Sequence, residues 1–329
     1  MPTRILEVSE DKIKLRCDIA TKPYEYLVLS HMWGQNHGQQ LLLKEGNIED
    51  FKRDIPMQKL GTSATFREAI RVTRTLGYRY IWIDSLCIIQ DSKSDWEYEA
   101  TRMATVYGNA VCNIACLFPP NNDQQPTTRE DPRVWHPCVL RPATSSQPGV
   151  YFEHVNRAWI LSDKRYGRDW LLQNKWPLFQ RAWTFQEYLL SPRTLLLGHK
   201  NLMYQCSQFF YDELLGPIGS SPNPSPTTSV TPETPSLDTD LCKSKYFPPS
   251  LSDLSKLCSS DPCAPVLLSF LRNWLSLINE YRARNLSFGK DRIIAIAGIA
   301  RAFAHLGNLT YLAGLWIECF PVTLLWAAF

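Results

Sequence analysis

The feature that most constrains the fold of this chain is an alternation of apolar and amphipathic segments between residues 24 and 118. Residues 24–34, 80–91 and 110–118 are apolar runs of the kind found in buried strands. The two segments between them repeat apolar residues at helical spacing: Phe66, Ala69, Ile70, Thr73 and Leu76 in the first, and Trp96, Ala100, Met103 and Tyr107 in the second. Strand, helix, strand, helix, strand is typical of a mostly parallel sheet flanked by helices, so the sequence predicts an α/β fold.

Local signals place the ends of these helices. Ser63 is a suitable N-cap for the first helix, and Gly77 is a suitable stop. In the second helix, Ser94 and Glu97 have the spacing of a capping box. A third, shorter helix is expected over residues 181–190, where Pro192 ends it.

The chain divides by composition into four regions. Residues 1–23 read as one or two lead-in strands, and residues 24–213 carry the α/β pattern with an added hairpin around residues 193–206. Residues 214–264 are rich in Pro, Ser and Thr, so we expect a disordered insertion there. Residues 265–329 read as a helical C-terminal region that is truncated, because the chain stops within an apolar pattern.

Composition excludes several classes of protein. With 35 Lys and Arg against 32 Asp and Glu, the net charge is +3 and no basic block favours nucleic acid. The ten cysteines include no CxxC pair, so we expect free thiols, no metal site and a cytoplasmic location. Residues 309–329 are long enough to span a membrane, but Glu318 and Pro321 interrupt them. They predict a buried helix followed by a short apolar element, with no membrane association.

Polar residues stand where two of the predicted core strands end. Ser30 and His31 end the first strand, and Asp84, Ser85 and Cys87 follow the second. In an open parallel sheet, ligands bind beyond the carboxyl ends of the strands, at a switch in strand order. The sequence therefore predicts a ligand cleft between these two strand ends.

Each of these residues also has a structural interpretation. Asp84 can bind a ligand hydroxyl or cap the next turn, and Cys87 with His31 can form a thiolate nucleophile or pack as ordinary core residues. Trp33, Trp82, Trp96 and Trp183 can stack on a ligand ring or fill the core. No glycine-rich phosphate loop is present, so a nucleotide would need a site of another kind.

Four segments together resemble one family, the fungal heterokaryon incompatibility (HET) domain proteins. They are YLVLSHMWG, the long stretch from ATFREAI to GNAVCNIA, PLFQRAWTFQEYLLSPRTLL and RNLSFGKDRIIAIAGIA. The resemblance covers about residues 24–197 and resumes at residue 284. The chain departs from the family where it has His31 in place of an aromatic residue and Ala182 in place of glycine.

The resemblance implies a role in non-self recognition between fungal cells, in which activated HET domains trigger programmed cell death. The family is similar to Toll/interleukin-receptor (TIR) domains, which have a flavodoxin-like fold; some of them cleave NAD and others act by self-association. Trp183 and Glu187 in WTFQE look similar to the W-x-x-x-E element that carries the catalytic glutamate of NAD-cleaving TIR domains. Glu187 is thereby the candidate catalytic residue, and Ser30, Asp84, Ser85 and Trp183 are the candidate ligand-binding residues.

Two hypotheses from different classes follow. In the first, the protein is a signalling module that forms a homo-oligomer when a protein partner in allorecognition activates it, and it requires no cofactor. In the second, it is an NAD glycohydrolase in which Glu187 stabilises the oxocarbenium-like state, and NAD is the substrate. A Cys–His hydrolase built on Cys87 and His31 is a further alternative. A cleft shared by Glu187, Ser30 and Asp84 would favour the NAD glycohydrolase.

Overall fold

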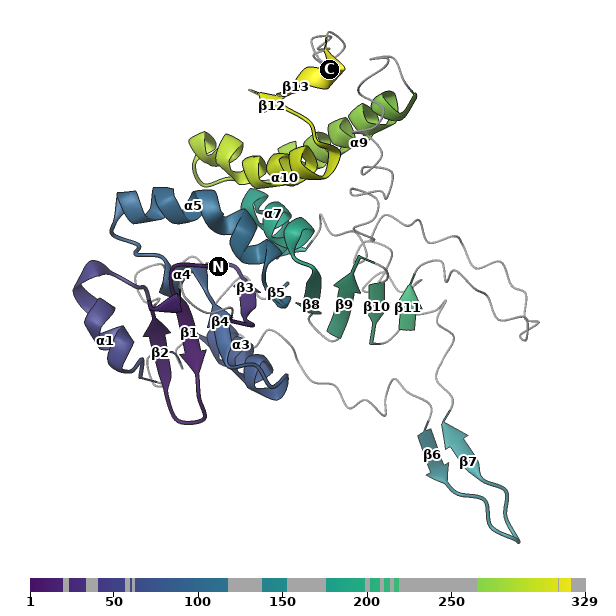
Figure 1. Ribbon diagram of the computed structural model, residues 1–329. Helices are drawn as coiled ribbons and strands as arrows, with labels where there is room; N and C mark the ends of the chain where they lie inside the picture. The colour runs from purple at the N-terminus through teal and green to yellow at the C-terminus, as the bar shows by residue number, and fades with distance from the viewer. Residues whose placement is uncertain are drawn as a thin grey trace.

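The computed structural model contains one nine-stranded sheet covered by helices (Figure 1). It describes residues 1–19, 24–33, 41–56, 60, 63–117, 138–152, 176–198, 202–207, 210–213, 216–218, 265–312 and 314–320. The strand order is β11-β10-β9-β8-β5-β3-β4-β1-β2. The strands are β1 (Ile5–Val8), β2 (Ile13–Arg16), β3 (Leu27–Ser30), β4 (Tyr80–Trp82), β5 (Cys112–Cys116), β8 (Arg193–Leu197), β9 (Leu202–Cys206), β10 (Phe210–Asp212) and β11 (Gly216–Ile218).

The centre of the sheet is parallel. Strand β3 pairs in parallel with β4 on one side and β5 on the other, and β5 pairs in parallel with β8. Across the sheet, these four strands lie in the order β4-β3-β5-β8. They are the second, first, third and fourth of the four along the chain, which is the strand order of flavodoxin-like folds. The predicted α/β fold is thus confirmed, and the carboxyl ends of β3, β4 and β5 meet at one edge.

Both margins of the sheet are antiparallel. The lead-in strands β1 and β2 form a hairpin whose first strand pairs with β4. On the other side, β8 and β9 form the predicted hairpin, and β10 and β11 extend it. Hairpins need only short connections, whereas a parallel pair needs a crossover, so these locally connected strands add at the margins.

Helices cover the two faces unequally (Figure 1). Helix α3 (Ala64–Thr75) lies on one face, and α1 (Ile48–Arg53) lies next to β2. Helices α5 (Lys93–Gly108) and α7 (Ala182–Leu190) cover the opposite face. A further layer of α9 (Pro265–Arg282) and α10 (Arg292–Gly307) packs on α5 and α7. The apolar core accordingly has two parts, one around the sheet and one between α7, α9 and α10.

The helix boundaries follow most of the local signals. The Ser63 side chain accepts a hydrogen bond from the backbone N–H of Phe66, and Gly77 has a φ of 78°, so both predicted ends of α3 are confirmed. The predicted capping box of α5 is wrong. Helix α5 begins at Lys93 with Ser92 as its N-cap, which places Ser94 inside the first turn.

The apolar run over residues 80–91 changes conformation after three strand residues. Strand β4 ends at Trp82, and the short helix α4 (Asp84–Cys87) follows directly. The backbone N–H of Cys87 donates to the Ile83 carbonyl at 2.8 Å, which closes this helical turn. The Asp84 side chain accepts a hydrogen bond from the backbone N–H of Ser85 at 2.7 Å, so this carboxylate stabilises the first turn of α4.

The C-terminal region departs from the prediction after α10. Residues 309–320 were expected to begin a buried helix, but β12 (Tyr311–Leu312) and β13 (Leu315–Trp316) pair as a hairpin instead. Gly314 has a φ of 93°, a conformation that favours glycine and permits the tight turn. Residues 321–329 lie outside the described residues.

The expected disordered insertion lies largely outside the described residues. Within residues 214–264 the structure describes only β11. Within residues 119–152 it describes the two-stranded sheet of β6 (Cys138–Arg141) and β7 (Val150–Phe152), which extends away from the main sheet in Figure 1. No helix among the described residues combines the length and apolar character needed to cross a bilayer.

Candidate functional site

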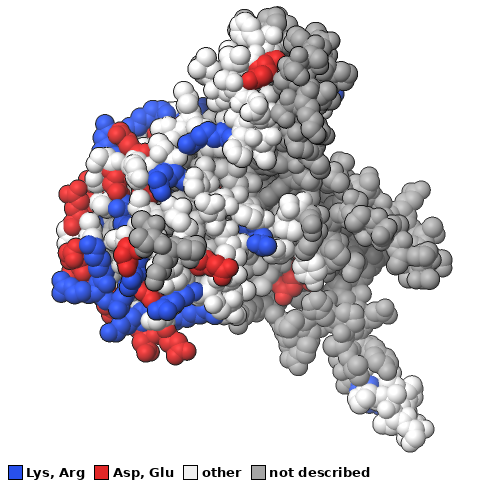
Figure 2. Space-filling model, viewed as in Figure 1, with Lys and Arg blue, Asp and Glu red and all other residues white. Residues whose placement is uncertain are grey.

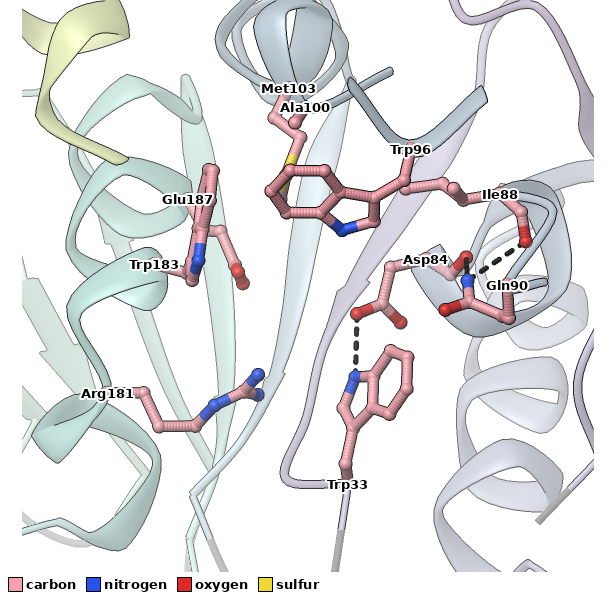
Figure 3. A pocket seen from close by; sticks show the side chains of 10 residues that line it. All are labelled: Trp33, Asp84, Ile88, Gln90, Trp96, Ala100, Met103, Arg181, Trp183 and Glu187. Atoms are coloured by element: carbon pink, nitrogen blue, oxygen red, sulfur yellow. Dashed lines mark hydrogen bonds between the residues drawn. The ribbon is translucent and has the colours of Figure 1, made fainter. Parts of the chain in front are cut away.

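A cavity lies beyond the carboxyl ends of β3 and β4, against α5 and α7 (Figure 3). Its volume is about 100 Å³, and its lining includes three indoles, two carboxyl groups and one guanidinium: Trp33, Asp84, Trp96, Arg181, Trp183 and Glu187. Pockets that enclose small molecules usually measure about 300 to 1,000 Å³. A cavity of this size can enclose one ring or one sugar of a ligand, while the remainder would lie outside it.

Glu187 reaches the end of β3 from helix α7. The Ser30 hydroxyl donates to Oε2 of Glu187 at 2.5 Å, and Glu187 is only 5% exposed. Ser30 ends β3 and pairs in register with Ala115 of β5, so this hydrogen bond lies beside the switch in strand order. The sequence places these two residues 157 positions apart, and the parallel sheet brings them together.

Burial gives the Glu187 carboxyl an unusual acidity. Removal from water raises its pKa from 4.5 to about 7, because the charged form loses its hydration. The nearby Arg181 guanidinium and the Ser30 hydrogen bond each lower the pKa, and Asp84 raises it. The carboxyl is therefore poised to exchange a proton near neutral pH, as acid–base groups in active sites commonly are.

Asp84 lies across the cavity from Glu187. Its Oδ2 accepts a hydrogen bond from the indole N–H of Trp33 at 2.7 Å, as Figure 3 shows. Its Oδ1 accepts from the Ser85 backbone, so the carboxylate both lines the cavity and holds the turn of α4. The structural and ligand-facing interpretations of Asp84 are compatible in this geometry.

His31 and Cys87 do not form a nucleophile pair at this cavity. Burial lowers the pKa of His31, and neither ring nitrogen has a hydrogen-bond partner among the described residues. Burial raises the pKa of the Cys87 thiol to about 12, so the thiol stays protonated at neutral pH. Neither side chain belongs to the lining of the cavity. This arrangement opposes the Cys–His hydrolase alternative.

The candidate ligand-binding residues divide into two groups. Asp84 and Trp183 line the cavity directly, and Ser30 reaches it through its bond to Glu187. Ser85 is fully buried and lies outside the lining, so the structure does not bring it to the cavity. Trp96 also lines the cavity, and its ring meets that of Trp183 edge to face at 6.4 Å.

Sequence reasoning missed Arg181, whose guanidinium points into the same space as the two carboxyl groups (Figure 3). One of its nitrogens donates to the His31 carbonyl at 2.5 Å. Its place in RAWTFQE, two residues before Trp183, was the available signal. That signal was weak, because an arginine before a short helix is usually a solvated surface residue.

Residues of the C-terminal region form hydrogen bonds with α7 and with its first residues. The segment between α9 and α10 pairs with the start of α7: Asn285 bridges Arg181, its N–H donates to the Gln180 carbonyl, and its carbonyl accepts from Ala182. One turn further along α7, the Gln186 side chain accepts from the backbone N–H of Gly298 in α10 at 3.1 Å. These contacts hold the helix that carries Glu187.

Metal ligands are not gathered at this site. Within the ranges that the structure describes, no group of three or more His, Cys, Asp or Glu side chains could hold a metal ion. The chemistry available at the cavity is that of carboxyl, hydroxyl and guanidinium groups between aromatic walls.

Comparisons with known proteins agree with the resemblance of the sequence. Residues 26–187 match the family model of the heterokaryon incompatibility protein (HET) family, which spans β3 to α7 and includes every residue of the cavity lining. Heterokaryon incompatibility protein 6, OR allele, of Neurospora crassa is 23% identical over 217 residues, or 56% of this chain and 31% of the relative. The chain thus spans about a third of the length of that relative. No solved structure matches, so the likeness to TIR domains stays a prediction. Residues 26–187 of the chain are therefore a heterokaryon incompatibility (HET) domain.

Proposed function

We propose that this protein is an effector of fungal non-self recognition that triggers programmed cell death in the cytoplasm. The observation that carries this proposal is the HET family match over residues 26–187, together with a relative named for heterokaryon incompatibility. The upstream activator is a protein partner in allorecognition. Activation clusters the chain into a homo-oligomer, and the clustered domains signal.

The surface of the C-terminal helices supports self-association. Several large apolar side chains are exposed there, among them Leu268, Leu275, Phe288, Ile293 and Leu312. In Figure 2 the charged side chains gather mainly over the N-terminal strands and helices, and the described residues near the C-terminus are mostly uncharged. Exposed apolar groups gathered on one region are typical of protein interaction surfaces.

Forced clustering tests this proposal. The full chain, fused to a drug-inducible dimerisation module, would be expressed in a filamentous fungus, and cell death would be measured by uptake of a membrane-impermeant dye. We expect death only after the drug is added, and less of it in a Leu275→Glu, Ile293→Glu double variant. Leu275 is 58% exposed and Ile293 is 78% exposed, so both substitutions leave the core intact. Survival of cells with clustered parent protein would reject the proposal.

A second candidate function is cleavage of NAD, and the Glu187–Ser30 pair favours it. A buried carboxyl with a pKa of about 7, hydrogen-bonded to a serine and surrounded by indoles, suits a reaction in which positive charge develops on a ribose. The bond between ribose C1′ and the nicotinamide nitrogen breaks, and nicotinamide leaves with the bonding electron pair. The Glu187 carboxylate stabilises the resulting oxocarbenium-like carbon. Water then adds to that carbon and releases a proton to the solvent.

The reaction would use the ionised form of Glu187. Because the pKa of this carboxyl is about 7, we expect cleavage to increase as pH rises through neutrality and then to level off. The cavity of about 100 Å³ would enclose either the nicotinamide ring or its ribose, so the adenosine part of NAD would lie outside.

A pair of isosteric variants tests the catalytic function. Glu187→Gln removes the carboxylate, and Glu99→Gln removes another buried carboxylate, on α5 and outside the cavity lining. Purified, clustered parent protein and Glu99→Gln protein should consume NAD, whereas Glu187→Gln protein should not. NAD consumption by none of the three proteins would reject the glycohydrolase, and equal consumption by all three would reject Glu187 as its catalytic residue. Either result would leave the signalling proposal intact.

A further inference from the structure

Among the described residues that line the cavity, Arg181 is the one with a cationic side chain. Figure 3 shows its guanidinium directed into the space between the Glu187 and Asp84 carboxyl groups. The side chain starts at the N-cap of α7, where the positive end of the helix dipole adds to its charge. The cavity therefore has a positive side, close to Glu187.

The hydrogen-bonding capacity of Arg181 is mostly unused. A guanidinium has five N–H donors in a planar fork. One terminal nitrogen of Arg181 donates to the His31 carbonyl. In the part of the chain that the structure describes, Arg181 makes no ion pair within salt-bridge distance, even though Glu187 and Asp84 line the same cavity. Among the residues that the structure describes, donors of this guanidinium that face the cavity therefore remain without a partner.

The backbone of Arg181 is fixed on both sides. Its own N–H donates to the Leu178 carbonyl, and the bridge to Asn285 joins it to the segment between α9 and α10. Gln180 and Ala182 on either side also bond to Asn285, at 2.6 and 2.8 Å. A side chain on a backbone held in this way keeps its direction, which is a requirement for an oriented binding group.

These observations point to an oxyanion as the group that completes the site. Arginine matches the geometry of phosphate oxygens with two parallel N–H donors, and it binds phosphate widely in proteins. Each oxygen of the Asp84 carboxylate already accepts one hydrogen bond, from the Trp33 indole and from the Ser85 backbone. Because the cavity holds only a ring or a sugar, a phosphate attached to that sugar would lie at its margin.

We propose that Arg181 binds the phosphate group of a ribose phosphate ligand whose sugar lies against Glu187. This inference rests on the second candidate function, and it identifies the part of the substrate that the site recognises. Arg181 is thus a specificity-determining residue for phosphorylated over unphosphorylated ribosides.

Two probes that differ in phosphate test the inference on the full chain. ADP-ribose carries two phosphates and has lost its nicotinamide, and nicotinamide riboside carries no phosphate. Binding of each is measured by calorimetry to parent, Arg181→Ala, Arg181→Lys and Arg193→Ala proteins. Arg193 is the matched control, because it also donates to a backbone carbonyl, that of Val111. It is the first residue of β8, so it lies at the edge of the sheet opposite the cavity. Thermal unfolding of each variant checks its fold.

We expect Arg181→Ala to weaken ADP-ribose binding about ten- to a hundredfold, the range that follows from loss of a charged hydrogen bond. Binding of nicotinamide riboside should change less than twofold. Arg181→Lys should retain part of the affinity, and Arg193→Ala should retain all of it. Added inorganic phosphate should compete with ADP-ribose in the parent protein and have little effect in Arg181→Ala.

The outcomes separate this inference from the glycohydrolase proposal. Arg181-dependent binding of ADP-ribose without NAD cleavage would support the phosphate site and reject the enzyme. NAD cleavage with a KM that Arg181→Ala does not change would reject the phosphate site alone. Failure of the parent protein to bind ADP-ribose, or an equal loss of both probes in a folded Arg181→Ala protein, would also overturn it.

Discussion

At the scale of single residues, Glu187 is held where its ionisation opposes folding. Its pKa is about 7 in the folded protein and 4.5 when exposed, so between these values the folded state binds more protons than the unfolded state. Stability from this group therefore falls as pH rises from about 4.5 to 7 and stays low above that range. A residue retained in spite of such a penalty is a candidate for function.

Glu187→Gln should raise the free energy of unfolding at pH 8 by up to about 3 kcal/mol, the value that the shift of the pKa implies. At pH 4 the difference should be close to zero, because the carboxyl is then protonated in both states. Urea denaturation at the two pH values measures both quantities. Glu97→Gln, at an exposed position of α5, is the control and should change the free energy of unfolding by less than about 0.5 kcal/mol at either pH value. A Glu187→Gln protein less stable than the parent at pH 8 would contradict the argument.

At the scale of helices and strands, local sequence accounts for some boundaries and packing accounts for others. The N-cap of α3 is a local device, because the Ser63 side chain bonds to the helix that it begins. The N-cap of α5 is Ser92, whose side chain makes no such bond. Both serines are N-caps, but only Ser63 stabilises its helix through a side-chain hydrogen bond.

Ser63→Ala should lower the free energy of unfolding by about 1 kcal/mol, because the N–H of Phe66 loses its acceptor. Ser92→Ala is the matched control and should have a smaller effect, since it removes no capping hydrogen bond. Both are measured by chemical denaturation at one pH. Equal effects of the two substitutions would show that the hydrogen bond is not the cause.

The contact between α10 and α7 depends on a glycine. A Cβ at Gly298 would overlap the Gln186 side chain and the Cβ of Ala104, because α10 approaches both α7 and α5 at this point. In an isolated helix, replacing glycine by alanine is stabilising by about 1 kcal/mol. Here steric overlap should reverse the sign.

Gly298→Ala is expected to destabilise the protein by about 1–3 kcal/mol, the range for overpacking of a close-packed interior. Gly289→Ala is the control, since a Cβ there meets no atom within 4 Å. Thermal unfolding compares the two variants. If the Gly298→Ala protein were as stable as the Gly289→Ala protein, this would contradict the close approach of α10 to α5 and α7.

At the scale of the whole molecule, the C-terminal helices and the matched HET region are joined through α7. The family match ends at residue 187, yet the second half of the core consists of α7 packed with α9 and α10. Arg284 lies at this junction. Its guanidinium stacks over the Phe185 ring at 4.3 Å and donates to the Phe179 carbonyl.

Arg284→Met should lower the free energy of unfolding by about 1–3 kcal/mol, because the substitution removes a buried charged hydrogen bond and leaves the Phe179 carbonyl without that donor. Arg272→Met, at an exposed position of α9, is the control and should change stability by less than about 0.5 kcal/mol. Hydrogen exchange would then show α7 opening more often in Arg284→Met protein. Unchanged protection of α7 would indicate that the C-terminal helices do not support it.

Much of the fold follows from patterns within single segments. Several elements can be predicted from short stretches of sequence, because each depends on neighbouring residues. They are β3 and β5 with their apolar runs, α3 with its helical period and its Ser63 and Gly77 ends, and the β8–β9 hairpin. The α4 turn and the β12–β13 hairpin were missed for the opposite reason. Short apolar runs suit a strand, a helix or a turn equally well, and their surroundings select among these.

The sequence by itself determined the α/β class, the family, and the expectation that Ser30 and Asp84 lie at one edge of a parallel sheet. These conclusions follow from the hydrophobic periodicity, from the polar residues at predicted strand ends and from the sequence motifs. Only the tertiary structure decided that Ser30 bonds to Glu187, that Arg181 enters the same cavity, and that Asn285 and Gly298 hold α7 in place. Those contacts join residues more than a hundred positions apart, and such contacts depend on how the sheet and helix layers pack, which no local pattern contains.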